Sequence, residues 1–550
     1  MNDMFDRHRG LLETAVKALS DRGFWSPFPE VPSGKIYGET AKDDGEAFFK
    51  ALLGTRLELP GHPEDARIGS EVSPWGPDLA ILYPATDAAT LVAASKAAGD
   101  AWADASPEHR VGVCLEILTR LNRISFEMAN AVMHTTGQAF AMAFQAGGPH
   151  AQDRGLEAVA TAWAEMTRTP GQATWEKPQG KAAPIVLEKN WQVVPRGIAL
   201  AIGCQTFPTW NTYPGLFASL ATGNTVIVKP HPGAILPLAL TVKVAREVLV
   251  EAGFPADVVL LAVDQAGAEI TKELVTHPDI AIIDYTGSSA FGEWVRNNAR
   301  SAQVFTEEAG VNSIVVAATD DFSGICANIA FSLSLYSGQM CTAPQDIFVP
   351  RAGIETNEGH KSFDEVAIAI GAAVDALLSD PARASGVCGT IANPATLARI
   401  DKARGFGRIV RDSQPLATGC SATPLIIALD AAETQVHEDE CFGPVAFIVA
   451  IDSAEAGIDA SANLARSKGA ITAALYDTEE ARIAYAVKAF ARAGVNLSIN
   501  LTGNIFVNQS AAFSDFHVTG GNPAGNASLT DTAFVANRFR LAMWRRPKAA

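Results

Sequence analysis

The chain has 550 residues, of which 48% are hydrophobic and 19% are charged. This length allows three or four folding units around a large core, and the composition excludes a disordered or fibrous protein. Lys and Arg supply 43 positive charges against 60 negative charges from Asp and Glu, so the net charge is −17. Because such a surface repels nucleic acids and anionic membranes, we expect neither as a partner.

The apolar stretches, the N-terminus and the cysteines indicate where the protein works and whether its thiols are free. Apolar stretches such as Ile198 to Cys204 are too short to cross a bilayer, and Asp3 and Asp6 stand where a signal peptide would be basic. We therefore expect a cytoplasmic protein. The seven cysteines are few, odd in number and scattered. This pattern argues against a disulfide framework and a metal site, and it leaves at least one thiol free to react.

The N-terminal part of the chain differs from the rest. Residues 1–70 mix charges with Pro and Gly, and only 11–19 and 48–53 have a helical pattern, so we expect an extension packed on the body of the protein. From Ala85 the pattern becomes helical. Ser106 is a predicted N-cap, and Pro107 occupies the first helical position.

Two series of alternating strands and helices follow. The first series predicts strands at 198–202, 225–228, 258–261, 280–283 and 314–316. The second predicts strands at 346–349, 424–427, 445–451 and 470–475. This alternation is typical of parallel sheets covered by helices, so we expect an α/β protein with a cleft between two layers.

Two predicted strand ends carry residues that could bind an anionic ligand. Thr286, Gly287 and Ser288 open a predicted helix, whose backbone N–H groups could hold a phosphate, although such a segment is more often only a turn. Lys229 ends another predicted strand. A lysine there is usually solvated, but ligands commonly bind at the carboxyl ends of parallel strands.

Two other residues could carry covalent chemistry. Cys341 lies in a turn just beyond a helical stretch, whereas Cys114 and Cys326 fit the commoner role of a buried apolar residue. Glu307 belongs to an acid pair that closes a predicted strand. A carboxylate there is usually solvated, but one that faces a cleft can act as a general base.

These motifs resemble those of the aldehyde dehydrogenase superfamily over about residues 70–520. Gly338-Gln339-Met340-Cys341 is similar to the superfamily's Gly-Gln-x-Cys and follows Glu307 at the usual interval of 34 residues. The resemblance implies that Cys341 is the nucleophile and Glu307 the base.

The same resemblance implies a cofactor site for NAD or NADP. Residues 223–230 look like the cofactor strand, which implies Lys229 at the adenosine ribose, and 286–288 look like the pyrophosphate turn. Glu440-Cys441-Phe442-Gly443-Pro444 resembles Glu-x-Phe-Gly-Pro. This match implies that Glu440 holds the nicotinamide ribose and that Phe442 packs near the nicotinamide.

The fold implied by the resemblance has a Rossmann-like cofactor domain, an α/β catalytic domain and a small β oligomerisation flap. We expect the extension at 1–70, the cofactor domain at 71–307 with the flap at 166–191, the catalytic domain at 308–505 and a C-terminal oligomerisation segment at 506–550. A homodimer or homotetramer is implied as well.

Within the superfamily, the extension and the segments 203–211 and 513–520 resemble the PaaN type of phenylacetic acid degradation protein. This closer resemblance implies a semialdehyde formed after opening of an aromatic ring, either free or linked to coenzyme A. It places four residues at the substrate: Phe207, Trp210, Asn211 and Phe513.

Three departures from the superfamily pattern affect the expected chemistry. Thr206 replaces the asparagine that usually stabilises the oxyanion, so Thr206, Gln205, Asn211 or backbone N–H groups could donate instead, and we expect the backbone N–H of Cys341 and Thr206 to share this role. Pro232 replaces a glutamate that repels the 2′-phosphate of NADP, which predicts that NADP is accepted or even preferred, with Lys229 and His231 near the phosphate. The segment 513–520 departs from Phe-Gly-Gly-x-Lys-x-Ser-Gly, which predicts a remodelled tunnel mouth.

The predicted reaction is attack of the Cys341 thiolate on an aldehyde, hydride transfer to the nicotinamide and release of an acid by water that Glu307 activates. The presence of Glu307 favours this hydrolytic reaction over acyl transfer to coenzyme A, which is the second hypothesis. A non-catalytic binder is the third, because Thr206 and Pro232 depart from the pattern.

Overall fold

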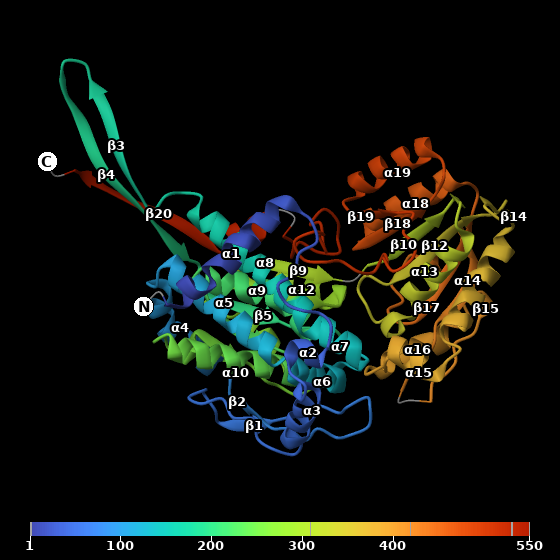
Figure 1. Ribbon diagram of the computed structural model, residues 1–550, viewed down its shortest axis with the longest axis horizontal. Helices are drawn as coiled ribbons and strands as arrows, with labels where there is room; N and C mark the ends of the chain where they lie inside the picture. The colour runs from blue at the N-terminus through green and yellow to red at the C-terminus, as the bar shows by residue number, and fades with distance from the viewer. Residues whose placement is uncertain (1–2, 309, 418–419, 530–531, 549–550) are drawn as a thin grey trace.

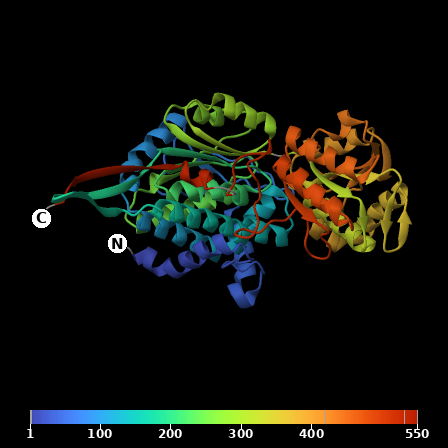
Figure 2. The same cartoon turned by 90° about the horizontal axis from the view of Figure 1, so that it is seen from above.

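The computed structural model describes residues 3–308, 310–417, 420–529 and 532–548. Figure 1 shows two lobes side by side and a long thin arm that projects from the first of them. The first lobe contains the N-terminal helices and a five-stranded sheet, and the second lobe contains a larger, seven-stranded sheet (Figures 1 and 2).

The N-terminal extension forms three helices: α1 (Asp3–Asp21), α2 (Gly34–Tyr37) and α3 (Ala41–Leu52). Helix α1 lies on α5 (Pro107–Arg123), where a Cβ at Gly112 would come within 2.6 Å of the backbone nitrogen of Phe5. The glycine therefore permits the close contact, and the expectation that this segment packs on the body is confirmed.

Five helices precede the first sheet: α4 (Ala88–Ala103), α5, α6 (Ser125–Thr136), α7 (Phe140–Gly147) and α8 (Pro149–Thr167). The predicted start of α5 is confirmed. The Ser106 side chain accepts a hydrogen bond of 3.3 Å from the backbone N–H of His109, and Pro107 occupies the first turn.

The sheet of the first lobe is entirely parallel, with the strand order β7-β6-β5-β8-β9. Its strands are β5 (Ile198–Ile202), β6 (Thr225–Lys229), β7 (Val259–Leu261), β8 (Ile280–Gly287) and β9 (Gln303–Glu308), and its helices are α9 (Pro208–Ala221), α10 (Leu236–Glu251), α11 (Ile270–Thr276) and α12 (Ser289–Asn298). The chain adds β6 and β7 on one side of β5, and β8 and β9 on the other. The carboxyl ends of β5 and β8 therefore flank a switch point, where α/β sheets bind ligands.

The main sheet of the second lobe has seven strands in the order β15-β16-β17-β12-β10-β18-β19, parallel except for β15. The strands are β10 (Asn312–Val316), β12 (Pro344–Pro350), β15 (Arg408–Arg411), β16 (Leu425–Asp430), β17 (Val445–Ile451), β18 (Thr472–Tyr476) and β19 (Asn496–Ile499), and the longer helices are α13 (Phe322–Ser334), α14 (Phe363–Leu377), α16 (Pro394–Ala403), α18 (Ala454–Lys468) and α19 (Glu480–Ala493). Buried Ile, Val and Leu fill the central strands, as both covered faces of a parallel sheet require. The predicted α/β class is confirmed.

The arm is an antiparallel sheet of β3 (Gln172–Gln179), β4 (Ala182–Pro195) and β20 (Phe539–Pro547). Strand β4 continues past residue 191, where the flap was expected to end. Residues 510–529, which belong to the expected C-terminal oligomerisation segment, lie beside the first lobe and away from the arm (Figure 1). The remaining elements are β1 (Ala66–Ile68), β2 (Tyr83–Ala85), β11 (Ala318–Thr319), β13 (Ile354–Thr356), β14 (Gly359–Lys361), α15 (Pro381–Cys388), α17 (Thr434–His437) and α20 (Ala533–Ala536). Within the described ranges, no helix combines the length and apolar character needed to cross a membrane.

Candidate active site

Cys341 follows a tight turn at the end of α13. Tyr336, Ser337 and Gly338 have φ values of 52°, 50° and 62°, which is the left-handed region that favours glycine. A Cβ on Gly338 would also lie 2.4 Å from the carbonyl oxygen of Gly443. Asn312 on β10 fixes the end of the turn, because its amide donates a hydrogen bond of 2.8 Å to the carbonyl of Cys341. The turn therefore holds a half-buried thiol at the edge of the second lobe.

Glu307 and Glu308 end β9 and point to opposite faces of the strand. The Glu308 carboxylate pairs with Arg296 on α12, whereas the Glu307 carboxylate accepts a hydrogen bond from the Asn211 amide on α9. The Glu307 side chain is only 3% exposed. Of the predicted acid pair, only Glu307 therefore faces the thiol.

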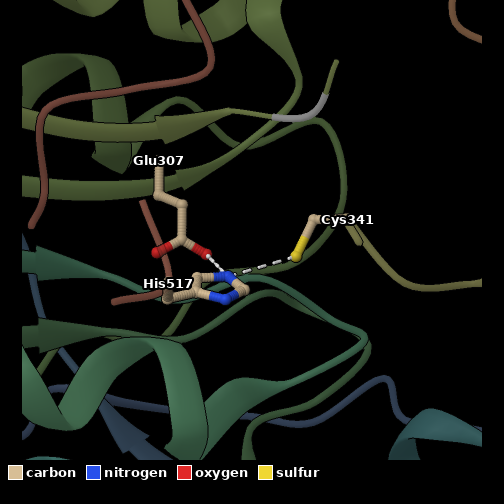
Figure 3. Close-up of side chains that lie close together, drawn as sticks. All are labelled: Glu307, Cys341 and His517. Carbon is tan, nitrogen blue, oxygen red and sulfur yellow. Dashed lines mark hydrogen bonds and ion pairs between the residues drawn. The ribbon is translucent and has the colours of Figure 1, made fainter. Parts of the chain in front are cut away.

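His517 joins the thiol to this carboxylate. Its Nε2 atom lies 3.1 Å from Oε1 of Glu307 and 3.6 Å from Sγ of Cys341 (Figure 3). The sulfur, the imidazole nitrogen and the carboxylate oxygen all lie within 4.8 Å of one another. His517 is absent from the residues that the sequence indicated, because the sequence showed only that 513–520 is unusual.

Burial and neighbouring charges set the proton affinities in this cluster. Burial alone would raise the pKa of Glu307, but the His517 charge and hydrogen bond, the Arg154 guanidinium and the Asn211 amide outweigh it and lower the pKa. Burial and the Glu307 charge raise the pKa of the Cys341 thiol well above its ordinary value. Burial lowers the pKa of His517, although Glu307 partly offsets this. The resting cluster therefore holds an ionised carboxylate and a protonated thiol.

A pocket beside the cluster is lined by Arg154 on α8, by Trp210 on α9 and by the loop around His517. The Arg154 guanidinium lies 3.6 Å from the centre of the Trp210 ring, and the His517 ring packs edge-on against the same indole at 4.5 Å. Arg154 is 8% exposed, and its Nη1 atom has no hydrogen-bond partner among the described residues. A buried cation therefore lies in the pocket beside the cluster.

The structure separates the four residues predicted at the substrate. Trp210 lines the pocket, and Asn211 contacts Glu307. Phe207 is buried against Tyr336 beneath the cysteine turn. Phe513 is completely buried against Trp25 of the extension, at a ring separation of 4.9 Å, and it does not line the pocket. The interpretation of Phe513 as a substrate contact therefore disagrees with its position.

Thr206 lies at the carboxyl end of β5, and its hydroxyl is 3.8 Å from the Cys204 sulfur. Two alternative oxyanion donors are placed elsewhere. The Asn211 amide donates to Glu307, and Gln205 lies against Gly233, where a Cβ would come within 2.6 Å of its amide nitrogen.

The predicted cofactor residues of the first lobe gather at the carboxyl edge of its sheet. Lys229 is buried, with its Nζ 2.7 Å from Asp264, and His231 beside it is exposed. Thr286 and Gly287 end β8, and the Ser288 side chain caps α12 by accepting a hydrogen bond from the backbone N–H of Phe291. Buried ammonium and backbone donors at a strand switch point are a set that fits a dinucleotide.

The other two cofactor residues precede β17 in the second lobe. Glu440 is exposed, yet it lies close enough to Cys341 to contribute to the raised thiol pKa. Phe442 is half-buried, and its carbonyl accepts a hydrogen bond of 2.6 Å from Arg399. Glu440 therefore lies near the cluster without contacting it directly.

A nucleophilic thiol, an ionised base and an adjoining dinucleotide-type sheet define an enzyme that combines covalent and redox chemistry. Residues 82–522 match the aldehyde dehydrogenase family, and the chain belongs to that family. It is an oxidoreductase that acts on aldehydes.

Comparisons with individual proteins agree with this family. The structure is similar to a crystal structure of an NAD-dependent aldehyde dehydrogenase from Burkholderia multivorans, with 54% identity, a TM-score of 0.98 and coverage of 100% of this chain and 99% of that one. The 1-pyrroline-5-carboxylate dehydrogenase 1 of Halalkalibacterium halodurans is 26% identical over 74% of this chain and 76% of its own length. The 1-pyrroline-5-carboxylate dehydrogenase of Bacillus subtilis is 26% identical over 77% of this chain and 81% of its own.

Proposed function

We propose that the protein oxidises an aldehyde to a carboxylic acid through a thioester on Cys341. The cluster of Cys341, His517 and Glu307 carries this proposal, because it unites a nucleophile with a proton acceptor. The Cys341 thiolate attacks the carbonyl carbon, and the carbonyl π electrons move to oxygen. NAD or NADP, when bound, accepts the hydride that leaves this carbon. Glu307 then takes a proton from water, whose oxygen attacks the thioester carbon, and the C–S bond breaks to release the acid and the Cys341 thiolate.

We propose that the first-lobe sheet and its helices hold the cofactor and that the second lobe carries the nucleophile, with the boundaries expected from the sequence. Lys229 contacts the adenosine ribose, and His231 lies near a 2′-phosphate when NADP is bound. Thr286, Gly287 and Ser288 hold the pyrophosphate. Glu440 holds the nicotinamide ribose and Phe442 packs near the ring. The shared edge of the sheet supports the first-lobe roles.

For the oxyanion, we propose that the backbone N–H of Cys341 and Thr206 are the donors. The position of Asn211 supports this choice, since its amide donates to Glu307. Donors of this kind lower the barrier by about 2.7 to 4 kcal/mol.

The hydrolytic reaction is tested by supplying the purified protein with NAD or NADP and a panel of semialdehydes, with and without free coenzyme A. We expect cofactor reduction and a free acid without coenzyme A. Acyl-coenzyme A formed only when coenzyme A is added would instead establish the acylating enzyme. Cofactor binding without any reduction would favour the non-catalytic binder.

We propose a semialdehyde as the substrate, formed after aromatic ring opening in phenylacetate degradation and either free or linked to coenzyme A. The resemblance of the extension and of 203–211 and 513–520 to the PaaN type supports the pathway. The pocket supports an acidic group on the substrate, because Arg154 is buried there with an unpartnered nitrogen. The two relatives called 1-pyrroline-5-carboxylate dehydrogenase are likewise named after a compound that carries a carboxylate.

Replacing Arg154 with glutamine is expected to raise KM for an aldehyde that ends in a carboxylate by about 10- to 100-fold, the loss typical of a hydrogen bond between charged groups. KM for an uncharged aldehyde of equal length should change much less. Arg168→Gln is the matched control, because Arg168 follows the same helix but is exposed. Equal changes in KM for both aldehydes would show that Arg154 does not bind the acidic group.

We also propose that the arm joins subunits into a homodimer or homotetramer that works in the cytoplasm. Large apolar side chains on the arm support an interface: Trp175, Ile185, Met543 and Trp544 are each at least 37% exposed in the single chain. Sedimentation of the intact protein measures the subunit number.

A further inference from the structure

The Cys341 thiol needs a proton acceptor before it can react. Burial and the neighbouring Glu307 carboxylate both favour the protonated thiol, whereas the thiolate is the nucleophile. Within the described part of the chain, the polar side chain in contact with the sulfur is His517, at 3.6 Å. The acceptor role that the superfamily pattern leaves to Glu307 therefore has a nearer candidate.

We propose that His517 is a catalytic residue that accepts the thiol proton of Cys341, and that Glu307 stabilises the imidazolium that results. This inference rests on the proposed use of Cys341 as the nucleophile. In the neutral imidazole that takes the proton, the ring hydrogen is on Nδ1, which faces Ser510, so the lone pair of Nε2 is free. The S–H bond breaks with its electron pair left on sulfur, and an N–H bond forms at Nε2 of His517. The same N–H then donates to Oε1 of Glu307 at 3.1 Å, so the carboxylate balances the new positive charge. The proton returns to sulfur from the same nitrogen when hydrolysis frees the thiolate.

The geometry explains why one nitrogen serves both partners. Nε2 lies between the sulfur and the carboxylate (Figure 3), and the other ring nitrogen, Nδ1, is 3.4 Å from the hydroxyl of Ser510. The Trp210 indole packs against the imidazole edge at 4.5 Å and limits its rotation. A small movement of one hydrogen therefore suffices for transfer.

Each charged neighbour of the imidazole stabilises one member of a thiolate–imidazolium pair. Glu307 on β9 favours the imidazolium but not the thiolate, whereas Arg154 on α8 favours the thiolate but not the imidazolium. Two further acids line the pocket: Glu157 ion-pairs with Arg22 at 3.4 Å, and Asp515 accepts a backbone hydrogen bond from Ala511. Both acids thus have partners of their own.

Segments from both ends of the chain hold the loop that carries His517. The Asn496 amide at the start of β19 donates to the carbonyl of Phe516 at 2.7 Å. In the extension, Arg22 stacks on Phe516 at 4.0 Å, and Trp25 packs on Phe513. We infer that the extension helps to fix the imidazole beside the thiol.

The test is the rate at which iodoacetamide alkylates Cys341 across a range of pH, without aldehyde or cofactor. Peptide mass spectrometry identifies the modified residue. We expect His517→Gln to lower the alkylation rate at neutral pH by roughly 10²-fold, the lower range for a general base. The difference in alkylation rate between the variant and the wild type should disappear at a pH high enough to ionise the thiol without the histidine.

Two variants separate this role from a structural one. His360→Gln makes the same change at an exposed histidine paired with Glu355 and should leave the rate unchanged. Asn496→Ala loosens the loop but keeps the imidazole, so it should lower the rate much less than His517→Gln. Identical pH profiles for the wild type and His517→Gln, or equal losses in the His517 and Asn496 variants, would overturn the proposal.

Because alkylation needs no aldehyde turnover, the two proposals can fail separately. If His517→Gln lowered the alkylation rate but the wild type oxidised no aldehyde, only the proposed function would be refuted. Full turnover with unchanged alkylation in His517→Gln would refute the role of His517 alone.

Discussion

Replacing Cys341 with serine is expected to lower kcat for aldehyde oxidation by roughly 10³-fold or more, because a hydroxyl is far harder to ionise than a thiol and is the weaker nucleophile. The dissociation constant for the cofactor should change little, since none of the residues proposed to hold it contacts the sulfur within the described ranges. Initial rates of cofactor reduction measure the first quantity, and fluorescence titration measures the second.

The matched control is Cys204→Ser. Cys204 also lies in the site, but within the described ranges its sulfur contacts Thr206 at 3.8 Å and Asn211 at 3.7 Å, not His517. We expect Cys204→Ser to keep kcat within a few fold of the wild type. If the loss of activity followed Cys204 and not Cys341, the nucleophile would have to be reassigned, and the turn built by Gly338 would have another purpose.

Most strands of the two large sheets were predictable from sequence as short apolar runs bounded by turn residues, but the strand at 314–316, predicted as the last of the first series, is β10 of the second-lobe sheet. Strand β5 matches its predicted bounds and β17 matches its own, since both faces of these strands are buried and leave no polar residue to blur the pattern. The pairing of a nucleophile with a base was also predictable, because Cys341 and Glu307 stand in motifs with a characteristic interval.

His517 and Arg154 could not be predicted in the same way. His517 lies 210 residues from Glu307 along the chain, and its loop has no regular secondary structure that would fix the direction of its side chain. Arg154 is one of several charged residues on α8, and only packing against Trp210 distinguishes it. Both positions depend on how the lobes and the C-terminal loop meet.

The burial of Phe513 has a similar cause. The sequence indicated a substrate contact from the position of this residue in an unusual C-terminal motif. In the structure, Phe513 has a φ of 65° and packs against Trp25, so a segment from the opposite end of the chain covers it. The same contact holds the loop that carries His517. Trp210 and Arg154 line the pocket, whereas Phe513 does not.

Replacing Glu307 with glutamine is expected to uncouple the two halves of the reaction. Glutamine has nearly the same shape but cannot take a proton from water, so hydrolysis of the thioester should slow by about 10²- to 10⁴-fold. In the wild type, His517, Arg154 and Asn211 lower the pKa of Glu307 despite its burial, which keeps this base ionised at neutral pH. The variant should therefore reduce up to one equivalent of cofactor per site in a burst and then nearly stop.

Intact-protein mass spectrometry after acid quenching checks this expectation, because the acyl group should add its mass at Cys341. Glu308→Gln is the matched control. It makes the same change one residue along the strand, where the carboxylate pairs with Arg296 on the opposite face, so it should lower the melting temperature without producing a burst. If Glu307→Gln abolished the burst and no acyl group accumulated, Glu307 would act before thioester formation. Its role would then be to hold the His517 proton while the sulfur attacks, and hydrolysis would need another base.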